Sequence, residues 1–577
     1  MPQDKVKENS GNLGLWAALA SLGYMFWCLG GMEMVERLAF YGLRSLVMLY
    51  AVIPSAEGGL GITVARLGVI LAVWSALQGF LPFFIGGLAD KYGYKLMMGV
   101  STLLKTASFV MMIFCHDFWS FLVSVVVLAV GTSFWVPSVQ GAVAKATNPE
   151  NSSLGWGLFY QAVNLGAFLS PLVAGYLRKM SWDYVFLACA IVGSVNLLIL
   201  LTYKEPGREE REQLKAENEK KRQGFGALLK NGAEVIKDPK MYLFLFIFSG
   251  FYLLYRYMSD ILPLHINDWV NSTDIVNTLT SWHIDVKNKI ISFIMVLDKT
   301  GSFVQPEGML NINCAIIMTV CFIFAYLSSK MKILHSISLG FVFVAASMAL
   351  LGVSHMGWIC ALAVVVFTLG EMFSNVKFSE FVGNYLAPDD KKATYLGIAQ
   401  VSYAVSATLE GYFGPFIYEI FSSKDTFARK LLGEAYNMNA DQLEAIPPGE
   451  AFERLTEVSG ISADVLTRQM YSDFAVANVW FFFGAIGLLT ALAMFAYSVW
   501  YGRHAGDKAV KTGEPAEAAA SEADSKRDAE DFKVAPETAE AQKETGAEVK
   551  ADKGAVGTAE ADGGTDKAKG GGEESKK

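Results

Sequence analysis

Charged residues are scarce in this chain of 577 residues, because Asp, Glu, Lys and Arg make up only 18% of it. Soluble domains carry about a quarter, so the composition argues against a single water-soluble globule. The six cysteines form no CxxC pair and the histidines lack metal-ligand spacing, so we expect reduced thiols and no metal or other cofactor. No HExxH or GxxxxGK[ST] segment occurs, which argues against a zinc peptidase and an ATP-driven pump. The net charge of -8 gives no indication of a nucleic-acid partner.

Apolar residues dominate instead, with 53% of the chain in the AVILMFWYC group. They occur in runs of about twenty, the length at which a helix crosses the hydrocarbon layer of a bilayer. We therefore predict an all-α, multi-pass protein whose surroundings are lipid. The first run is followed by Glu33, Glu36 and Arg37 rather than by a small-residue cleavage site, so we expect it to stay in the protein.

The apolar runs predict twelve transmembrane helices in two halves of six. Their approximate limits are 24–53, 64–87, 95–115, 119–144, 155–177, 182–203, 241–266, 308–329, 336–353, 357–386, 394–421 and 475–501. The expected divisions are a first half 1–203, a charged cytoplasmic linker 204–240 and a second half 241–501. Within the second half, segments 267–307 and 422–474 are expected to form small extracytoplasmic caps. The polar residues 502–577 are expected to form a disordered cytoplasmic tail.

Lysine and arginine in the short loops set the expected orientation. Lys91, Lys95 and the basic residues at 330–332 and 391–392 lie in loops on one side, whereas the pair at 178–179 lies on the other. The side with more basic residues is cytoplasmic. We therefore predict that both termini are cytoplasmic and that the protein resides in the cytoplasmic membrane.

The first span allows two interpretations. Residues 13–32 alone could cross the bilayer, and the charges that follow would then be an ordinary polar flank. A helix from Tyr24 to Ile53 instead uses the apolar run 45–53, which is too short to cross by itself, and places four charges at mid-depth. In such a helix one arc of about 140° contains Glu33, Glu36, Arg37, Phe40, Tyr41 and Arg44. Because charges are costly in lipid, we expect this charge-balanced stripe to face an internal cavity.

The same stripe carries a resemblance to a known family. The run from Glu33 to Arg44, EMVERLAFYGLR, resembles the first-helix signature ExxERFxYYG of the proton-dependent oligopeptide transporter family, a branch of the major facilitator superfamily. This resemblance implies the major facilitator fold, in which two six-helix halves with pseudo-two-fold symmetry rock about a central site. A monomer is expected.

A loop signature supports the resemblance. The segment GGLADKYGYK at 86–95 is similar to the superfamily's GxLADRxGRR. The equivalent loop of the second half, 328–332, is a degenerate copy of this signature in which only the cations remain. We expect this loop to hold neighbouring helix ends together and to release them when the transporter changes state. The matching residues are Gly86, Asp90, Lys91, Gly93 and Lys95.

Three further segments resemble the family where it contacts substrate. FYQAVNLGA at 159–167 is similar to FYxxINxGS and places Asn164 inside a helix, where either a neighbouring helix or a substrate would satisfy it. Glu371, followed by the LAP sequence at 386–388, resembles a carboxylate that binds the peptide amino terminus in the family. Asn313 matches an asparagine at the start of the eighth helix, where capping is the alternative role.

The sequence also departs from the family. Val136 stands where the family has a lysine that takes part in proton coupling and substrate binding. Ala399 and the segment 375–377 replace a common tryptophan and a Pro-Gly pair. We hypothesise that Arg256 or Lys377 supplies the missing cation, although each has a carboxylate at helical spacing with which it could simply pair.

The resemblance implies a secondary active transporter rather than an enzyme, with protons as the coupling ion and short peptides or similar small amphipathic solutes as substrate. The candidate proton-coupling residues are Glu33, Glu36 and Arg37. The candidate substrate-binding residues are Tyr41, Arg44, Asn164, Glu371, Asn313, Arg256 and Lys377. The alternatives are a major facilitator carrier or exporter for another solute with altered coupling, and a sensor or scaffold that has lost transport.

Overall fold

The computed structural model describes residues 21–44, 46–147, 152–205, 235, 237–387 and 392–504. These residues form helices joined by short loops, and the extended pairing among them is limited to two isolated bridges. The predicted all-α class is therefore confirmed. Most of the predicted linker and nearly all of the predicted tail lie outside the described residues.

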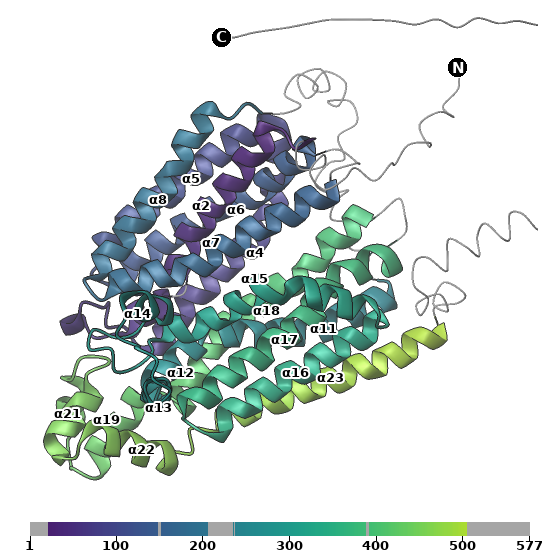
Figure 1. Ribbon diagram of the computed structural model, residues 1–577. Helices are drawn as coiled ribbons and strands as arrows, with labels where there is room; N and C mark the ends of the chain where they lie inside the picture. The colour runs from purple at the N-terminus through teal and green to yellow at the C-terminus, as the bar shows by residue number, and fades with distance from the viewer. Residues whose placement is uncertain are drawn as a thin grey trace, which may run out of the picture. The chain divides into compact units, whose positions relative to one another are not determined.

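The N-terminal half contains six long helices (Figure 1). They are α2 (Tyr24–Arg44), α4 (Val64–Tyr92), α5 (Tyr94–Ile113), α6 (Phe118–Ala146), α7 (Ser152–Arg178) and α8 (Trp182–Thr202), with the short α3 (Val47–Val52) and η1 (Ser55–Glu57) after α2. Polar side chains cap several of them: Thr63 accepts from the Arg66 amide, and Asp117 accepts from the amides of Trp119 and Ser120. Such caps satisfy backbone donors at helix starts.

The C-terminal half repeats the arrangement. Its long helices are α11 (Pro239–Asp260), α15 (Pro306–Ser329), α16 (Ile333–Val353), α17 (Gly357–Phe381), α18 (Lys392–Phe421) and α23 (Asn478–His504), with a π-helical turn η2 (Val382–Leu386) after α17. By length and composition nine helices of the described chain could cross a membrane. The other three predicted spans correspond to α2, α15 and α18. The exact number of spans therefore stays a prediction.

The two predicted insertions consist of short helices. The first contains α12 (Leu262–Trp269), α13 (Thr273–Ser281) and α14 (Lys289–Met295), and the second contains α19 (Lys424–Glu434), α20 (Ala440–Glu444), α21 (Ala451–Ser459) and α22 (Ala463–Asp473). Trp269 packs with residues of the second insertion in a separate hydrophobic cluster. These helices gather at one end of the bundle (Figure 1), which we call the cap end. The opposite end, where α8 finishes and α11 begins, is the linker end.

The first span differs from the single helix expected over Tyr24 to Ile53. Helix α2 ends at Arg44, and α3 begins at Val47. The amide of Leu46 donates to the carbonyl of Leu43, at 2.9 Å, rather than to the carbonyl four residues back as in an α-helix. The expected helix is therefore two helices, and Arg44 is the last residue of the first.

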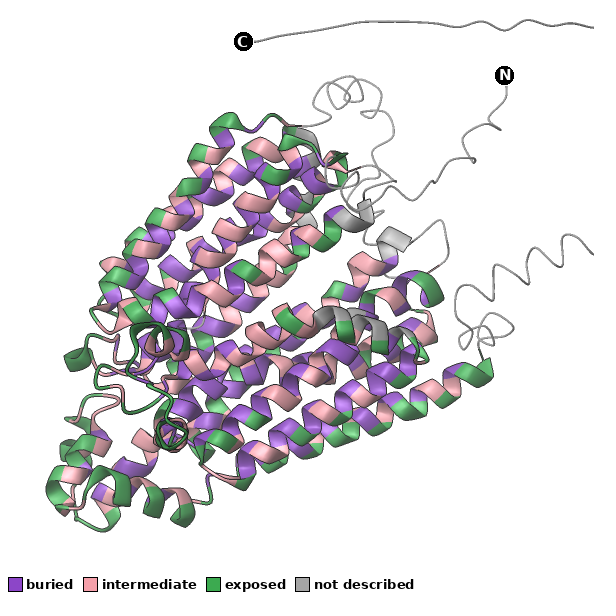
Figure 2. Cartoon of the chain, in the orientation of Figure 1, coloured by how far each residue is buried: buried purple, intermediate pink, exposed green. Residues whose placement is uncertain are grey.

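The outer surface of the bundle is apolar. Leu201, Phe246 and Leu489 are 78%, 68% and 66% exposed, and exposed positions recur along the outer sides of the helices (Figure 2). Exposed apolar surface of this extent is expected where lipid covers the protein. The buried stripes of the same helices form one large core that extends over both halves and a smaller one within the N-terminal half.

Candidate functional site

A central cavity of about 250 Å³ lies between the two halves. Its described lining comes from α2, α4 and α7 of the N-terminal half and from α11, α12, α15, α17 and α18 of the C-terminal half. Small-molecule sites typically measure about 300 to 1000 Å³, so this cavity is near the small end of that range. The charged side chains on its wall are Arg37, Arg44, Arg256, Asp260 and Glu371.

One wall of this cavity carries a guanidinium–carboxylate–guanidinium cluster. Nη2 of Arg44 lies 2.5 Å from Oδ1 of Asp260, and Nη2 of Arg256 lies 2.5 Å from Oδ2 of the same carboxylate. The Arg44 guanidinium also stacks over the Trp74 ring, with its carbon 4.7 Å from the ring centroid. Because Arg44 belongs to α2 and Asp260 to α11, this charge cluster links the two halves. Both arginines face the cavity, where a carboxylate could bind them.

A carboxylate lies on the wall formed by α15 and α17. Nδ2 of Asn313 donates to Oε2 of Glu371 and is also 3.0 Å from Oγ1 of Thr368. The Asn313 amide therefore interacts with side chains of α17 rather than capping its own helix. The oxygen of nearby Asn311 is buried and accepts no hydrogen bond within the described residues. This polar wall could bind an ammonium group.

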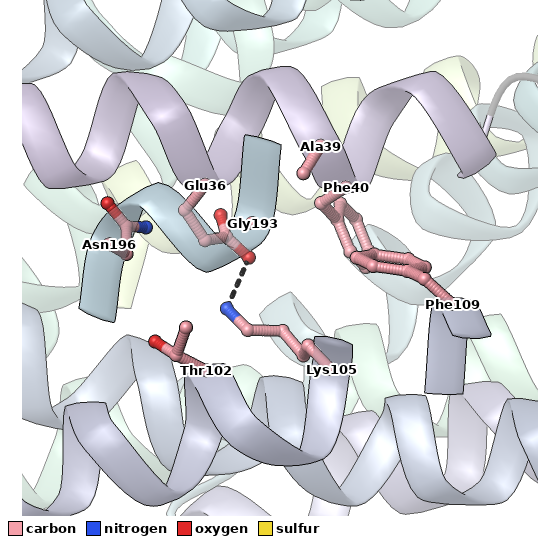
Figure 3. A pocket seen from close by; sticks show the side chains of 8 residues that line it. All are labelled: Glu36, Ala39, Phe40, Thr102, Lys105, Phe109, Gly193 and Asn196. Atoms are coloured by element: carbon pink, nitrogen blue, oxygen red, sulfur yellow. Dashed lines mark hydrogen bonds and ion pairs between the residues drawn. The ribbon is translucent and has the colours of Figure 1, made fainter. Parts of the chain in front are cut away.

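The two glutamates of the first-helix motif lie behind α2, inside the N-terminal half. Their exposed fractions are 1% for Glu33 and 2% for Glu36. Oε1 of Glu36 lies 2.9 Å from Nζ of Lys105, a residue of α5, and Figure 3 shows this pair between the two helices. Oε2 of Glu33 accepts from Nε1 of Trp135 at 2.7 Å. Nζ of Lys105 lies 4.2 Å from the centroid of the Trp135 ring, which completes a cation–π contact.

Arg37 connects these glutamates with the central cavity. Its Nε is 2.7 Å from Oε1 of Glu33 and 3.5 Å from Oε2 of Glu36, while its side chain also lines the cavity. The expectation that the whole stripe faces the cavity is therefore wrong for the two glutamates. At their level Lys105 of α5 and Trp135 of α6 supply the donors. Arg37, Phe40, Tyr41 and Arg44 do line the cavity.

Lys105 is the functional candidate that the sequence analysis missed. It is 5% exposed and lies in the middle of α5, an otherwise apolar helix. The rule that singled out Glu371, a lone charge inside a membrane helix, applies equally to Lys105. Glu410 in α18 was missed in the same way.

The region around Val136 forms a second cavity, of about 480 Å³, which extends towards the linker end. Pro82, Pro137 and Gln140 also line it, and it shares Gln78, Arg256 and Tyr403 with the central cavity. Arg256 therefore provides a cation near the level of Val136. Lys377 instead lies 2.7 Å from Oε2 of Glu380 and is not among the described lining residues of either cavity.

The remaining candidate residues are not among the described lining residues of either cavity. Asn164 is in α7, and its Nδ2 is buried without an acceptor among the described residues. Gly93 separates α4 from α5, and its φ of 105° is a backbone conformation that favours glycine. Nζ of Lys95 donates to the Tyr203 carbonyl at 2.5 Å, which ties this turn to the end of α8. Gly86, Asp90 and Lys91 lie in the last turns of α4, and the side chains of Asp90 and Lys91 lie outside the described part.

Most of the described contacts between the halves lie along α4 with α18 and α7 with α15, and α3 with α12 and α7 with α14 add further ones. At the cap end Arg178 of α7 pairs with Glu307 of α15, and the Ala65 amide donates to Glu419. Closer to the linker end, Gly79 approaches Ala404. Beyond this level the second cavity separates α4 and α6 from α18. The halves are thus closed at the cap end, and the cavities extend from the centre towards the linker end.

Comparisons with known proteins agree with this arrangement. A family model described as Major Facilitator Superfamily matches residues 38–409. Two curated relatives are an uncharacterised transporter, YclF, of Bacillus subtilis (28% identity, 30% of this chain and 36% of that protein) and the peptide transporter YePEPT of Yersinia enterocolitica (26% identity, 29% and 34%). Each match thus spans about a third of the relative. A crystal structure of a peptide transporter POT with sulfate aligns with a TM-score of 0.59 at 18% identity, covering 85% of this chain and 99% of that one.

Proposed function

This chain belongs to the major facilitator superfamily and is a membrane transporter rather than an enzyme, and from that premise we propose that it carries short peptides together with protons. The proposed substrates are di- or tripeptides and similar small amphipathic solutes. The proposed mechanism is alternating access, in which the two halves rock about the central cavity. We further propose that it acts as a monomer in the cytoplasmic membrane, with both termini in the cytoplasm.

The observation that carries the proposal is that one wall of the cavity presents guanidinium groups and another presents a carboxylate. Arg44 and Arg256 share a single carboxylate, Asp260, and so could bind the carboxylate of a peptide. Glu371 and the Asn311 oxygen lie on the other wall and could bind the amino terminus. A short peptide is a zwitterion, with opposite charges at its two ends, and so matches the opposite charges of these two walls.

The buried glutamates are the groups that we propose to couple proton binding to substrate transport. Glu36 pairs with Lys105 on α5 and lies near Arg37, whose side chain reaches the cavity. A proton on Glu36 would remove its charge, free Lys105 and change the partners of Arg37. In this proposal Arg256 is the cation near Val136, and Lys105 adds a second cation beside Glu36. Protonation is then linked both to helix packing within the N-terminal half and to the substrate cavity.

Counterflow and gradient-driven uptake in proteoliposomes test the proposal. Purified protein is reconstituted, and a library of dipeptides is assayed with and without an imposed pH gradient. We expect counterflow of a labelled dipeptide by wild-type protein and its accumulation when the outside is acidic. The Glu36→Gln variant should keep counterflow and lose accumulation. Concentrative uptake by Glu36→Gln in response to a pH step would contradict the proposed coupling role.

A carrier for another anionic solute is the second candidate. The described wall of the central cavity carries three guanidinium groups, of Arg37, Arg44 and Arg256, but only two carboxylates, Asp260 and Glu371. This excess of positive charge favours an anion with no amino group. Counterflow with small organic anions, but with no dipeptide, would support this candidate. Glu371→Gln should then leave transport nearly unchanged, whereas a peptide carrier should lose at least tenfold in affinity.

A further inference from the structure

A third cavity, of about 320 Å³, lies at the cap end, beside the central cavity. Its described lining comes from α7, α13, α14, α15 and α17, and from Val304 between α14 and α15. Apart from Asn311, the described lining residues are apolar side chains or glycine. We call this cavity the side pocket. The proposed transport mechanism does not use its apolar walls.

Specific contacts hold the walls of the side pocket in place. Nε1 of Trp358, in α17, donates to Oγ1 of Thr278, in α13, at 3.1 Å. A Cβ at Gly308 would lie 2.2 Å from the carbonyl oxygen of Met295, so the end of α14 packs directly against α15. The first insertion is thus tied to the transmembrane helices on two sides of the pocket. The space that it encloses is therefore preformed, as is usual for small-molecule sites.

The side pocket opens towards the outer surface of the bundle. On α15 it is lined by Gly308, Ile312 and Ala315. At 100° per residue these three share a stripe about 80° wide with Ile323. Ile323 is 63% exposed and so lies on the apolar surface of the bundle, while Trp358, another lining residue, is itself 37% exposed. The pocket therefore opens on the side that lipid covers, and an apolar molecule can reach it from there.

One polar group faces this apolar space. Asn311 is 4% exposed and lines both the side pocket and the central cavity. Its Oδ1 is buried and accepts no hydrogen bond from any residue in the described part of the chain. The amide of Asn313, two residues along, instead interacts with Thr368 and Glu371. Because an unpaired buried acceptor is costly, the Asn311 oxygen would be stabilised by a ligand that carries a donor.

We propose that the side pocket binds a small primary amine with an apolar body, which enters from the lipid-facing side and places its ammonium group at the oxygen of Asn311. The apolar body would bury its surface against the walls of the pocket. An ammonium group fits better than a hydroxyl group, because the central cavity, which Asn311 also lines, contains the carboxylate of Glu371. Its three donors can serve Asn311 and acceptors in the central cavity together. This site goes beyond the proposed peptide function, since it needs neither Arg44 nor Arg256.

The first test detects occupancy of the side pocket. Ala315→Cys is introduced into the full chain without its native cysteines, and the protein in lipid nanodiscs is labelled with methyl methanethiosulfonate. The probe ligand is 2-phenylethylamine. At ten times its dissociation constant we expect labelling to slow about tenfold, because only about one site in eleven stays empty. Ile323→Cys, on the same stripe but outside the pocket, is the matched control and should label at an unchanged rate. Labelling of Ala315→Cys that the amine does not slow would overturn the inference.

The second test asks whether the donor is recognised. Propylbenzene has the shape of 2-phenylethylamine, with a methyl group in place of the amine. Adding Asn311→Leu should raise the concentration of amine that half-protects Ala315→Cys by about tenfold or more, and should leave that of propylbenzene nearly unchanged. An equal shift for both ligands, or no shift, would overturn the inference. Protection by propylbenzene but not by the amine would do so too, since the occupant would then be a hydrocarbon such as a lipid acyl chain.

A further pair of variants covers the case in which Asn311→Leu does not fold. Ala361→Leu narrows the side pocket, whereas Leu362→Phe adds bulk at the neighbouring, 47% exposed position outside it. The amine should lose its protection of Ala315→Cys in the first and keep it in the second, and protection unchanged in Ala361→Leu would overturn the inference. No peptide is present in these tests. Dipeptide counterflow without protection by the amine would leave the proposed function standing and overturn the inference, and the reverse result would do the opposite.

Discussion

Lys105 shows how a single buried charge is held in this fold. Its ammonium group meets the Glu36 carboxylate at 2.9 Å and the face of the Trp135 ring, while Asn196 and Thr102 line the small pocket beside it (Figure 3). Removing both charges from such a pair is often tolerated, whereas removing one leaves the other without compensation. The pair therefore holds α5 against α2 only while both residues are charged.

A double-mutant cycle at this pair forms the first residue-scale prediction. Lys105→Met should lower the free energy of unfolding by about 3 kcal/mol, because Glu36 would remain buried without its cation. The double variant Lys105→Met/Glu36→Gln should recover most of that loss. Thermal and denaturant unfolding of the four proteins in detergent measure the coupling. Additive losses would mean that the two side chains do not stabilise one another.

Residues of the site differ in how far sequence could predict them. The motif placed Arg37, Tyr41 and Arg44 correctly on the cavity wall, because helical periodicity fixes their common face. The partners of Glu33 and Glu36 lie on α5 and α6, at positions far away in the chain. Periodicity within one helix carries no information about which helix covers it. Lys105 could have been noticed as a lone charge, but its partner could not.

Helices α4 and α18 form the closest contact between the halves, and glycines make it possible. A Cβ at Gly411 would lie 2.8 Å from backbone atoms of Leu71 and Ala72, and one at Gly79 would lie 2.6 Å from the Ala404 side chain. Small residues let membrane helices approach closely, where dispersion and weak hydrogen bonds replace the hydrophobic effect. This contact extends from Gly411 to Gly79 and so runs past the level of the central cavity.

Gly411→Ala tests this element. The added methyl group would meet backbone that cannot turn away, so we expect a loss of about 1 to 3 kcal/mol in unfolding free energy. Gly99→Ala in α5 is the matched control, since a Cβ there meets nothing within 4 Å. Alanine is the better helix former, so the control should gain up to about 1 kcal/mol. Thermal unfolding in detergent compares the two, and equal shifts would contradict the packing argument.

The order of the helices was predictable, but their continuity was less so. Long apolar runs with caps such as Asp117 and Thr63 indicate where α4 and α6 begin. Gly42 lies two residues before Arg44, but it is inside α2, so it does not mark where the helix ends. Arg44 pairs with Asp260 on α11, and α3 contacts α4 and α12. Tertiary contacts of this kind cannot be read from local sequence.

At the scale of the whole bundle, the two halves are held together by charges at several depths. Arg44 pairs with Asp260 at the cavity, Arg178 pairs with Glu307 at the cap end, and Glu419 accepts from the Ala65 amide. A transporter that alternates must break such contacts in each cycle. Glu307 is fully buried, and its Oε2 has no hydrogen-bond donor among the described residues, so its pairing depends on Arg178.

The cap-end pair should therefore set how often the bundle opens on that side. Glu307→Gln removes one charge and keeps the shape, so the closed state should lose about 1.4 kcal/mol, which corresponds to a tenfold rise in the cap-open population. A cysteine placed at Ser259, which lines the central cavity, reports opening in a background without the native cysteines. We expect an impermeant thiol reagent added from the cap side to label it about tenfold faster than in the parent. The charge-reversed variant Arg178→Glu/Glu307→Arg should return labelling to the slow rate, since it restores attraction across the same contact. Equal labelling rates in all three proteins would show that the pair does not control the opening, and the packing of α4 against α18 would then hold the halves closed without it.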